Sequence, residues 1–137
     1  MRKNISNRDM PAIIVSNTDR DQLRRLAVSA MDRMPEVANE LLTEIERATI
    51  VASPAVPRNV IQMGSTAEIV AGGDGRRRVT LVFPSDADIS SGKISILTPI
   101  GAALIGLSEG QSIIWSTRDG REQQMTVLAV EPMTVGA

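Results

Sequence analysis

The sequence predicts an α+β protein in which a short N-terminal antiparallel helical hairpin precedes a small antiparallel sheet with one short helix. Apolar residues recur at helical spacing before residue 50, whereas short β-rich runs dominate after residue 60. Between these parts, residues 52–59 contain two prolines and show no periodicity. We therefore expect a mobile terminus, a hairpin, a linker and a sheet domain at residues 1–10, 11–51, 52–59 and 60–137, in that order.

The hairpin is predicted from two amphipathic segments. In the first, Asp19 to Met31, leucine and alanine repeat every three or four positions, and Asn17 or Thr18 precedes it as a candidate N-cap. In the second, Pro35 to Thr49, proline takes the first helical position, where its missing N–H costs nothing. The connection between them is short, so the helices should run antiparallel. Residues 12–15 form a short extended piece before the first helix.

The sheet domain is predicted from alternation and turn residues. Residues 76–83 place Val79, Leu81 and Phe83 on one face, as a half-buried strand does. Residues 72–75 form a hairpin turn before it, because glycine and aspartate tolerate a positive φ. The other strand segments are expected at residues 60–63, 67–71, 94–97, 112–117 and 122–130, with a polar loop at residues 84–93.

The stretch from Ile94 to Trp115 is the most informative part of the chain. A β-rich run meets the breaker Thr98-Pro99, and the apolar helix Ile100 to Ile105 follows. Gly106 stands where a helix ends with a positive φ, which glycine adopts without steric cost, and Gly110 lies in the next turn. This order of strand, helix, glycine stop, turn and strand determines the architecture of the C-terminal half.

Composition excludes several classes of function. Histidine and cysteine are absent, which removes the commonest general base, disulfides and thiolate metal sites. The net charge is −1, which argues against binding of nucleic acid through phosphate neutralisation. No apolar run is long enough for an export signal or a membrane span, so we expect a cytoplasmic protein. We also expect no cofactor.

The motif residues resemble a known family. The run Ser95-x-x-Thr98-Pro99-Ile100-Gly101-x-Ala103-Leu104-Ile105-Gly106-Leu107-x-x-Gly110 looks like the C-terminal domain of the Gre transcript-cleavage factors. Those domains usually have an arginine just after the position of Gly101, where this chain has Ala102. The variant PxGAALxGLxxGxSIxW is similar instead to the Rnk proteins, which are named regulators of nucleoside diphosphate kinase and are Gre-like with a shorter arm. The start Pro11 to Val15 and the end Val127 to Glu131 fit that family too.

The resemblance implies an FKBP-like C-terminal domain and a monomer that binds RNA polymerase near its secondary channel, without direct contact with nucleic acid or membrane. Candidate partner contacts lie at the hairpin tip, at the start of the short helix and in the last turn: Asp32, Met34, Glu36, Thr98, Pro99, Ile100, Arg118 and Arg121. The glycines of the motif, Gly101, Gly106 and Gly110, are expected to be structural.

Asp32 and Glu36 leave alternatives open. In Gre factors, acidic residues at the tip of a long coiled coil help to hold a metal in the polymerase active centre. A helical arm of roughly 14 residues spans only about 21 Å, about half of a Gre arm. We therefore expect a regulator that is not an enzyme and that competes with Gre factors without stimulating cleavage. The alternatives are a residual Gre-type cleavage stimulator that uses Asp32 and Glu36, or a generic FKBP-like protein-interaction module.

Two further expectations concern the surface and the division of the chain. Arg76, Arg77 and Arg78 form the densest basic cluster, for which we favour a charged edge strand over a docking site for an acidic partner. Residues 54–137 hold nearly all the apolar strands, so we expect them to fold alone. The two helices, of about 14 residues each, should need tertiary support.

Overall fold

The computed structural model describes residues 10–71, 75–116 and 119–131, except for the side chains of Trp115 and Ser116. Most of the predicted mobile terminus, most of the predicted turn at residues 72–75, and Arg118 therefore lie outside the described residues. The described chain is α+β, as predicted from its sequence pattern.

The N-terminal unit places two helices between two short strands. In chain order it consists of β1 (Ile14–Ser16), α1 (Asn17–Ala30), α2 (Pro35–Arg47) and β2 (Thr49–Val51), and β1 pairs with β2 in parallel. α1 begins two residues earlier than predicted because Ser16, the last residue of β1, is its N-cap: the Ser16 hydroxyl accepts the backbone N–H of Asp19 at 2.9 Å. α2 begins at Pro35, as the sequence predicted, and ends at Arg47, two residues before the predicted end.

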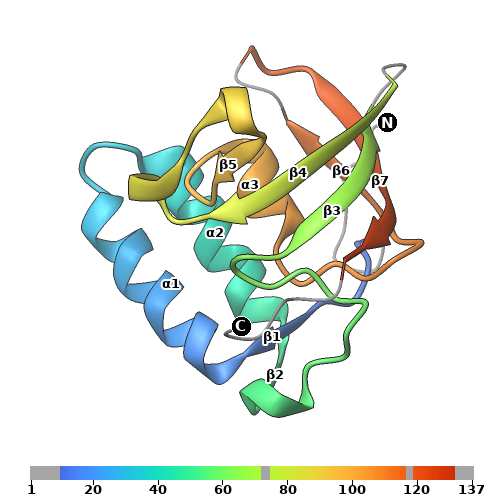
Figure 1. The fold of residues 1–137 in the computed structure, drawn as a ribbon. Helices are drawn as coiled ribbons and strands as arrows, with labels where there is room; N and C mark the ends of the chain where they lie inside the picture. Colours follow the sequence, from blue (N-terminus) through green and yellow to red (C-terminus); the bar gives the residue numbers. More distant parts are fainter. Residues whose placement is uncertain (1–9, 72–74, 117–118, 132–137) are drawn as a thin grey trace, which may run out of the picture.

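The C-terminal unit contains a five-stranded sheet. Its strands are β3 (Thr66–Ala71), β4 (Arg76–Val82), β5 (Lys93–Ser95), β6 (Ser112–Ser116) and β7 (Glu122–Val130), arranged in the order β5-β4-β3-β7-β6 (Figure 1). Three of the four pairings are antiparallel, but β5 runs parallel to β4. The prediction of a purely antiparallel sheet was therefore wrong, and the sheet is mixed.

The reason for the parallel pairing lies in the segment between β4 and β5. It contains two short 3₁₀ helices, η3 (Pro84–Asp86) and η4 (Ile89–Ser91), where the sequence suggested a polar loop. These turns return the chain to the middle of β4, where Lys93 pairs with Thr80 and β5 runs in the same direction as β4. A parallel pair requires such a crossover. The predicted strand at residues 60–63 is reduced to a single bridge between Val60 and Ser108.

The short helix α3 (Pro99–Leu104) joins the two units. Figure 1 shows α3 between α2 and the sheet, and α3 packs against both α2 and β6. Buried residues of α1, α2, α3 and the inner face of the sheet form one hydrophobic cluster, which includes Leu23, Ala27, Leu41, Ile69, Leu81, Leu104, Ile105, Met125 and Val127.

The hairpin and the sheet domain share one hydrophobic core. α2 of the hairpin packs against α3, whose Leu104 is 1% exposed in the whole protein. Residues 54–137 therefore share their hydrophobic core with α1 and α2, and their folding alone stays a prediction. In the described ranges, no helix has both the length and the apolar character needed to cross a bilayer.

Candidate functional site

The hairpin tip is a tight turn between α1 and α2. The backbone N–H groups of Arg33 and Met34 both donate to the carbonyl of Ala30, at 3.1 and 2.8 Å. Asp32 and Glu36 are exposed on either side of this turn. Met34 is only half exposed, and its side chain packs against the hydrophobic core. Met34 therefore presents only part of its side chain at the tip.

A row of three glutamates extends from the tip along α2. Glu36, Glu40 and Glu44 are spaced four residues apart, which places them on one side of the helix. Partial burial raises the pKa of Glu40, and the neighbouring carboxylates of Glu36 and Glu44 raise it further. The four-residue spacing is a visible sequence signal of this row, although Glu40 and Glu44 were not among the predicted site residues.

The start of α3 is fixed by Thr98. Its hydroxyl accepts the backbone N–H of Gly101 at 3.1 Å and donates to the carbonyl of Ser95 at 2.7 Å. Pro99 takes the first helical position, as proline favours, and Ile100 is half-buried against the core. Thr98 therefore ties the helix to β5, and its hydroxyl is already engaged within the protein.

The three motif glycines have different reasons to be glycine. Gly101 has no unusual φ, but a Cβ there would lie 2.1 Å from the carbonyl oxygen of Ser95. Gly106 has a φ of +83°, and a Cβ there would lie 2.8 Å from the Cβ of Ile13. Gly110 has a φ of +89° but open space around it. Glycine is required at Gly101 by the close approach of β5, at Gly106 by the positive φ and by close packing, and at Gly110 by the positive φ alone.

The remaining candidate contacts lie in the turn between β6 and β7. Arg121 is exposed, and its Nε lies 3.4 Å from Oδ2 of Asp119; Arg118 lies outside the described residues. In Figure 1 the hairpin tip is at the left of the molecule and this turn is at the top, with α3 beside α2. The structure thus joins α3 to the hairpin but leaves the hairpin tip and the β6–β7 turn at separate margins.

The basic cluster occupies the part of β4 that β5 does not cover. β5 pairs only with Thr80 to Val82, so Arg76 to Arg78 remain beside one neighbouring strand. Arg78 forms two hydrogen bonds with Glu131, at 2.6 and 2.8 Å, and Arg76 lies 3.6 Å from Glu68. The hydrogen bonds from Arg78 lower the pKa of Glu131. These contacts fit a charged edge whose cations are partly paired on the sheet itself.

Comparison with known proteins assigns both units of the chain. Residues 56–132 match the family described as transcription elongation factor GreA/GreB, C-term, and residues 11–51 match the Rnk N-terminus. The regulator of nucleoside diphosphate kinase from Escherichia coli (strain K12) is 32% identical over 122 residues, which are 88% of this chain and 90% of that protein. The chain belongs to the Rnk family.

The same comparison confirms the Gre-like fold of this Rnk-family protein. The solved structure of the prokaryotic transcription elongation factor GreA/GreB from Nitrosomonas europaea is 33% identical and has a TM-score of 0.69. The match covers 88% of this chain and 98% of that one. The transcription elongation factor GreA of Streptococcus sanguinis (strain SK36) is 35% identical over 94 residues, and the match covers 68% of this chain and 58% of that factor.

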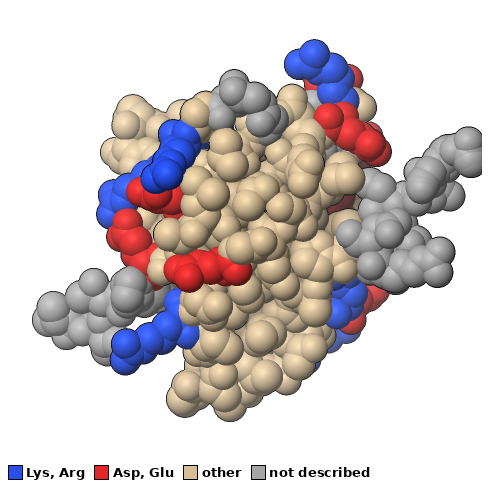
Figure 2. Space-filling model, turned by 90° about the vertical axis from the view of Figure 1, so that its right-hand side faces the viewer, with Lys and Arg blue, Asp and Glu red and all other residues tan. Residues whose placement is uncertain are grey.

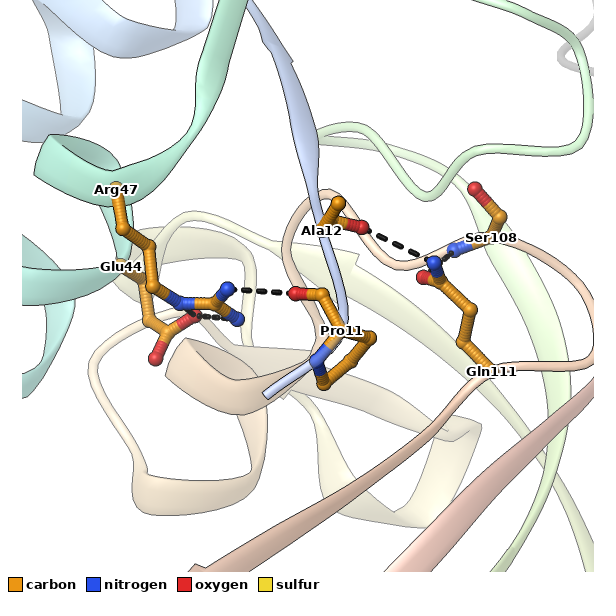
Figure 3. A network of polar contacts seen from close by, with 6 residues as sticks. All are labelled: Pro11, Ala12, Glu44, Arg47, Ser108 and Gln111. Carbon is orange, nitrogen blue, oxygen red and sulfur yellow. Dashed lines mark hydrogen bonds and ion pairs between the residues drawn. The ribbon is translucent and has the colours of Figure 1, made fainter. Parts of the chain in front are cut away.

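A polar network holds the Rnk-type hairpin to the Gre-type unit (Figure 3). Arg47 of α2 donates to the carbonyl of Pro11 and forms an ion pair with Glu44, and both charged side chains are less than 15% exposed. In the same N-terminal segment, before β1, the carbonyl of Ala12 accepts a hydrogen bond from Nε2 of Gln111 at 3.0 Å, and Oε1 of Gln111 accepts the backbone N–H of Ser108 at 2.9 Å. The N-terminal segment is thereby bound to both units.

The hairpin of the Rnk-family chain is fixed on the sheet domain by apolar packing and by polar contacts at its base, so its tip has a defined position. Within the described residues, no group of three or more acidic side chains is placed to hold a metal ion.

Proposed function

We propose that this protein is a cytoplasmic bacterial transcription regulator that binds RNA polymerase near its secondary channel and does not stimulate transcript cleavage. Membership of the Rnk family and the Gre-like C-terminal unit support the choice of partner. The protein acts as a monomer on the polymerase, and its effect there is to compete with Gre factors. We extend to it the regulation of nucleoside diphosphate kinase that the name of the E. coli relative states, although no described residue accounts for that link.

The observation that supports this function most is the reach of the hairpin. α1 has 14 residues and α2 has 13, so a helix of this length extends about 21 Å. α2 packs against α3, and Ala30 and Val37, the buried residues nearest the tip, both belong to the hydrophobic core. Asp32 and Glu36 therefore stay close to the body of the protein, where they cannot enter a distant catalytic centre.

The proposed contacts are the tip residues Asp32, Met34 and Glu36, the start of α3 at Thr98, Pro99 and Ile100, and, at a separate margin of the protein, Arg118 and Arg121 between β6 and β7. The half-buried Met34 and Ile100 supply apolar surface, and the exposed charges form its rim. Because hydrogen bonds already engage Thr98, we assign it to holding Pro99 and Ile100 in position.

The function is tested with purified polymerase and a backtracked elongation complex. The protein should bind core polymerase, leave the transcript at full length, and slow the cleavage stimulated by a Gre factor when it is present in excess. Arg121→Glu should weaken binding, whereas the matched charge reversal Arg77→Glu, on the exposed part of β4, should not. Stimulated cleavage that disappears in Asp32→Asn or Glu36→Gln would establish the enzyme-activating alternative instead. Failure to bind polymerase would leave a module for another protein partner.

A further inference from the structure

The two edges of the five-stranded sheet differ in how they are protected. β5, at one edge, has three residues, begins with the exposed Lys93 and is preceded by the 3₁₀ helix η4. β6, at the other edge, has five residues, Ser112–Ser116, without a charge, a proline or a glycine. Short strands and edge lysines are the usual means by which proteins prevent pairing between sheet edges, and β6 has neither.

The backbone groups on the outer side of β6 follow from the ladder with β7. Gly110 donates to the carbonyl of Val127 at 2.8 Å, and Val127 donates to the carbonyl of Gln111 at 2.9 Å. In an antiparallel ladder, hydrogen-bonded and non-hydrogen-bonded pairs alternate, so Ile113 points its backbone groups toward Met125. The backbone groups of Ser112 and Ile114 then point away from β7, and no hydrogen bond joins them to another segment among the described residues.

On the outer face beside this edge, the exposed Glu122 lies opposite Ser116 at the end of β6, and the positions nearer its middle are uncharged. Ile114 is 41% exposed and Leu128 is 39% exposed, and the positions between them are Gln124 and Thr126. Figure 2, viewed from the right-hand side of Figure 1, shows large areas without charged side chains, interrupted by acidic side chains near the middle of the face and by charged side chains at its margins. The hydroxyls of Ser112 and Thr126 bond to each other at 2.7 Å, so they need no further partner.

We propose that a second copy of this chain pairs antiparallel along β6, about a two-fold axis, and joins two five-stranded sheets into one. Free backbone donors and acceptors in a row select a β-strand as the occupant. A second copy fits this edge because neither strand brings a charge into the contact. With the axis at Ile114, Ser112 faces Ser116 and the two isoleucines face each other, so small positions match small ones.

This pairing does not depend on the proposed function. A contact of one five-residue strand with its copy lies at the low end of interface areas, below about 1,200 Å². The association should therefore be weak and should increase with concentration. A single chain bound to polymerase and a paired free form are compatible, because pairing would be lost on dilution.

The test is the oligomeric state of the full chain. Sedimentation equilibrium over a concentration series should show a monomer–dimer equilibrium for the wild type, and Ile114→Lys should weaken it at least tenfold. Ile89→Lys is the matched control, because Ile89 is 85% exposed on η4, away from this edge, and the change adds the same charge. Circular dichroism checks that both variants keep the fold.

Hydrogen exchange locates the contact without a substitution. The amides of Ser112 and Ile114 should become more protected in the wild type as its concentration rises, whereas those of β5 should not change. A chain that stays monomeric at every concentration overturns the proposal. It is also overturned by a dimer that Ile114→Lys and Ile89→Lys affect equally, or whose formation leaves the two β6 amides unprotected.

Discussion

Replacing Gly106 with alanine should destabilise the fold more than the same change at Gly110. Both glycines have a positive φ, +83° and +89°, which costs about 1–2 kcal/mol for a residue with a Cβ. At Gly110 that is the whole effect, because a new Cβ would meet nothing within 4 Å. At Gly106 the new Cβ would lie 2.8 Å from the Cβ of Ile13 and 3.1 Å from the carbonyl oxygen of Ile14, so β1 must move.

The cost of moving β1 sets the difference between the two variants. Overpacking of a well-filled site typically costs about 1–3 kcal/mol, which places Gly106→Ala at roughly 2–5 kcal/mol in total. The displacement would also disturb the hydrogen bond from the N–H of Ile14 to the carbonyl of Gly106, now 3.2 Å long. A loss of this size is a large fraction of the stability of a small protein, about 5–15 kcal/mol.

Urea unfolding followed by circular dichroism measures both costs. Gly101→Ala completes the series, because its Cβ would lie 2.1 Å from the carbonyl oxygen of Ser95 although its φ is ordinary. It should therefore destabilise through sterics alone. Equal decreases in the free energy of unfolding for Gly106→Ala and Gly110→Ala would show that β1 does not pack closely on Gly106. A neutral Gly101→Ala would contradict the close approach of α3 and β5.

Two further predictions concern buried charge. Burial raises the pKa of Asp19, although the N–H of Met63 donates to its carboxylate and opposes the shift. The folded state then holds the proton more tightly, so this contribution to stability is present in full below pH 3.8 and is lost as the pH rises through the folded pKa. Asp19→Asn cannot titrate, and the wild type should lose stability relative to it as the pH rises in urea unfolding series; a constant difference would refute the shift. Arg47→Met leaves the carboxylate of Glu44 buried without its partner and should cost about 3–5 kcal/mol, and the double variant with Glu44→Met should cost less than that. Additive losses in this cycle would show that the two side chains do not act as a pair.

The helices were predictable because their signals are local. The apolar spacing and Pro35 placed α2 to within two residues, and Thr98 with Pro99 marked the start of α3. The N-cap of α1 was missed because it depends on where β1 ends, which the three residues of that strand do not reveal. The direction of β5 was missed for a similar reason. It depends on the path through η3 and η4, where the carboxylate of Asp88 accepts hydrogen bonds from the hydroxyls of Ser90 and Ser91.

The candidate site depended more on long-range packing than the fold did. The sequence could show that Met34 is apolar and lies at a turn, but only the packing shows that the core covers half of it. Gln111 gave no signal at all, since its contact with Ala12 joins positions 99 residues apart. The row of glutamates on α2 was readable from its spacing. The asymmetry between the edges β5 and β6 became visible only with the strand order.

The parallel pair of β1 and β2 closes the base of the hairpin. The start of α1 and the end of α2 are thereby held together at the base, independently of the turn that joins the helices at the tip. Whole helical turns added in register beyond Ala30 and before Pro35 would move the tip outward by about 5.4 Å each without disturbing the buried base. Arm length in this architecture is therefore a variable that insertion can adjust independently of the sheet, and a short arm and a long arm can be alternative settings of one scaffold.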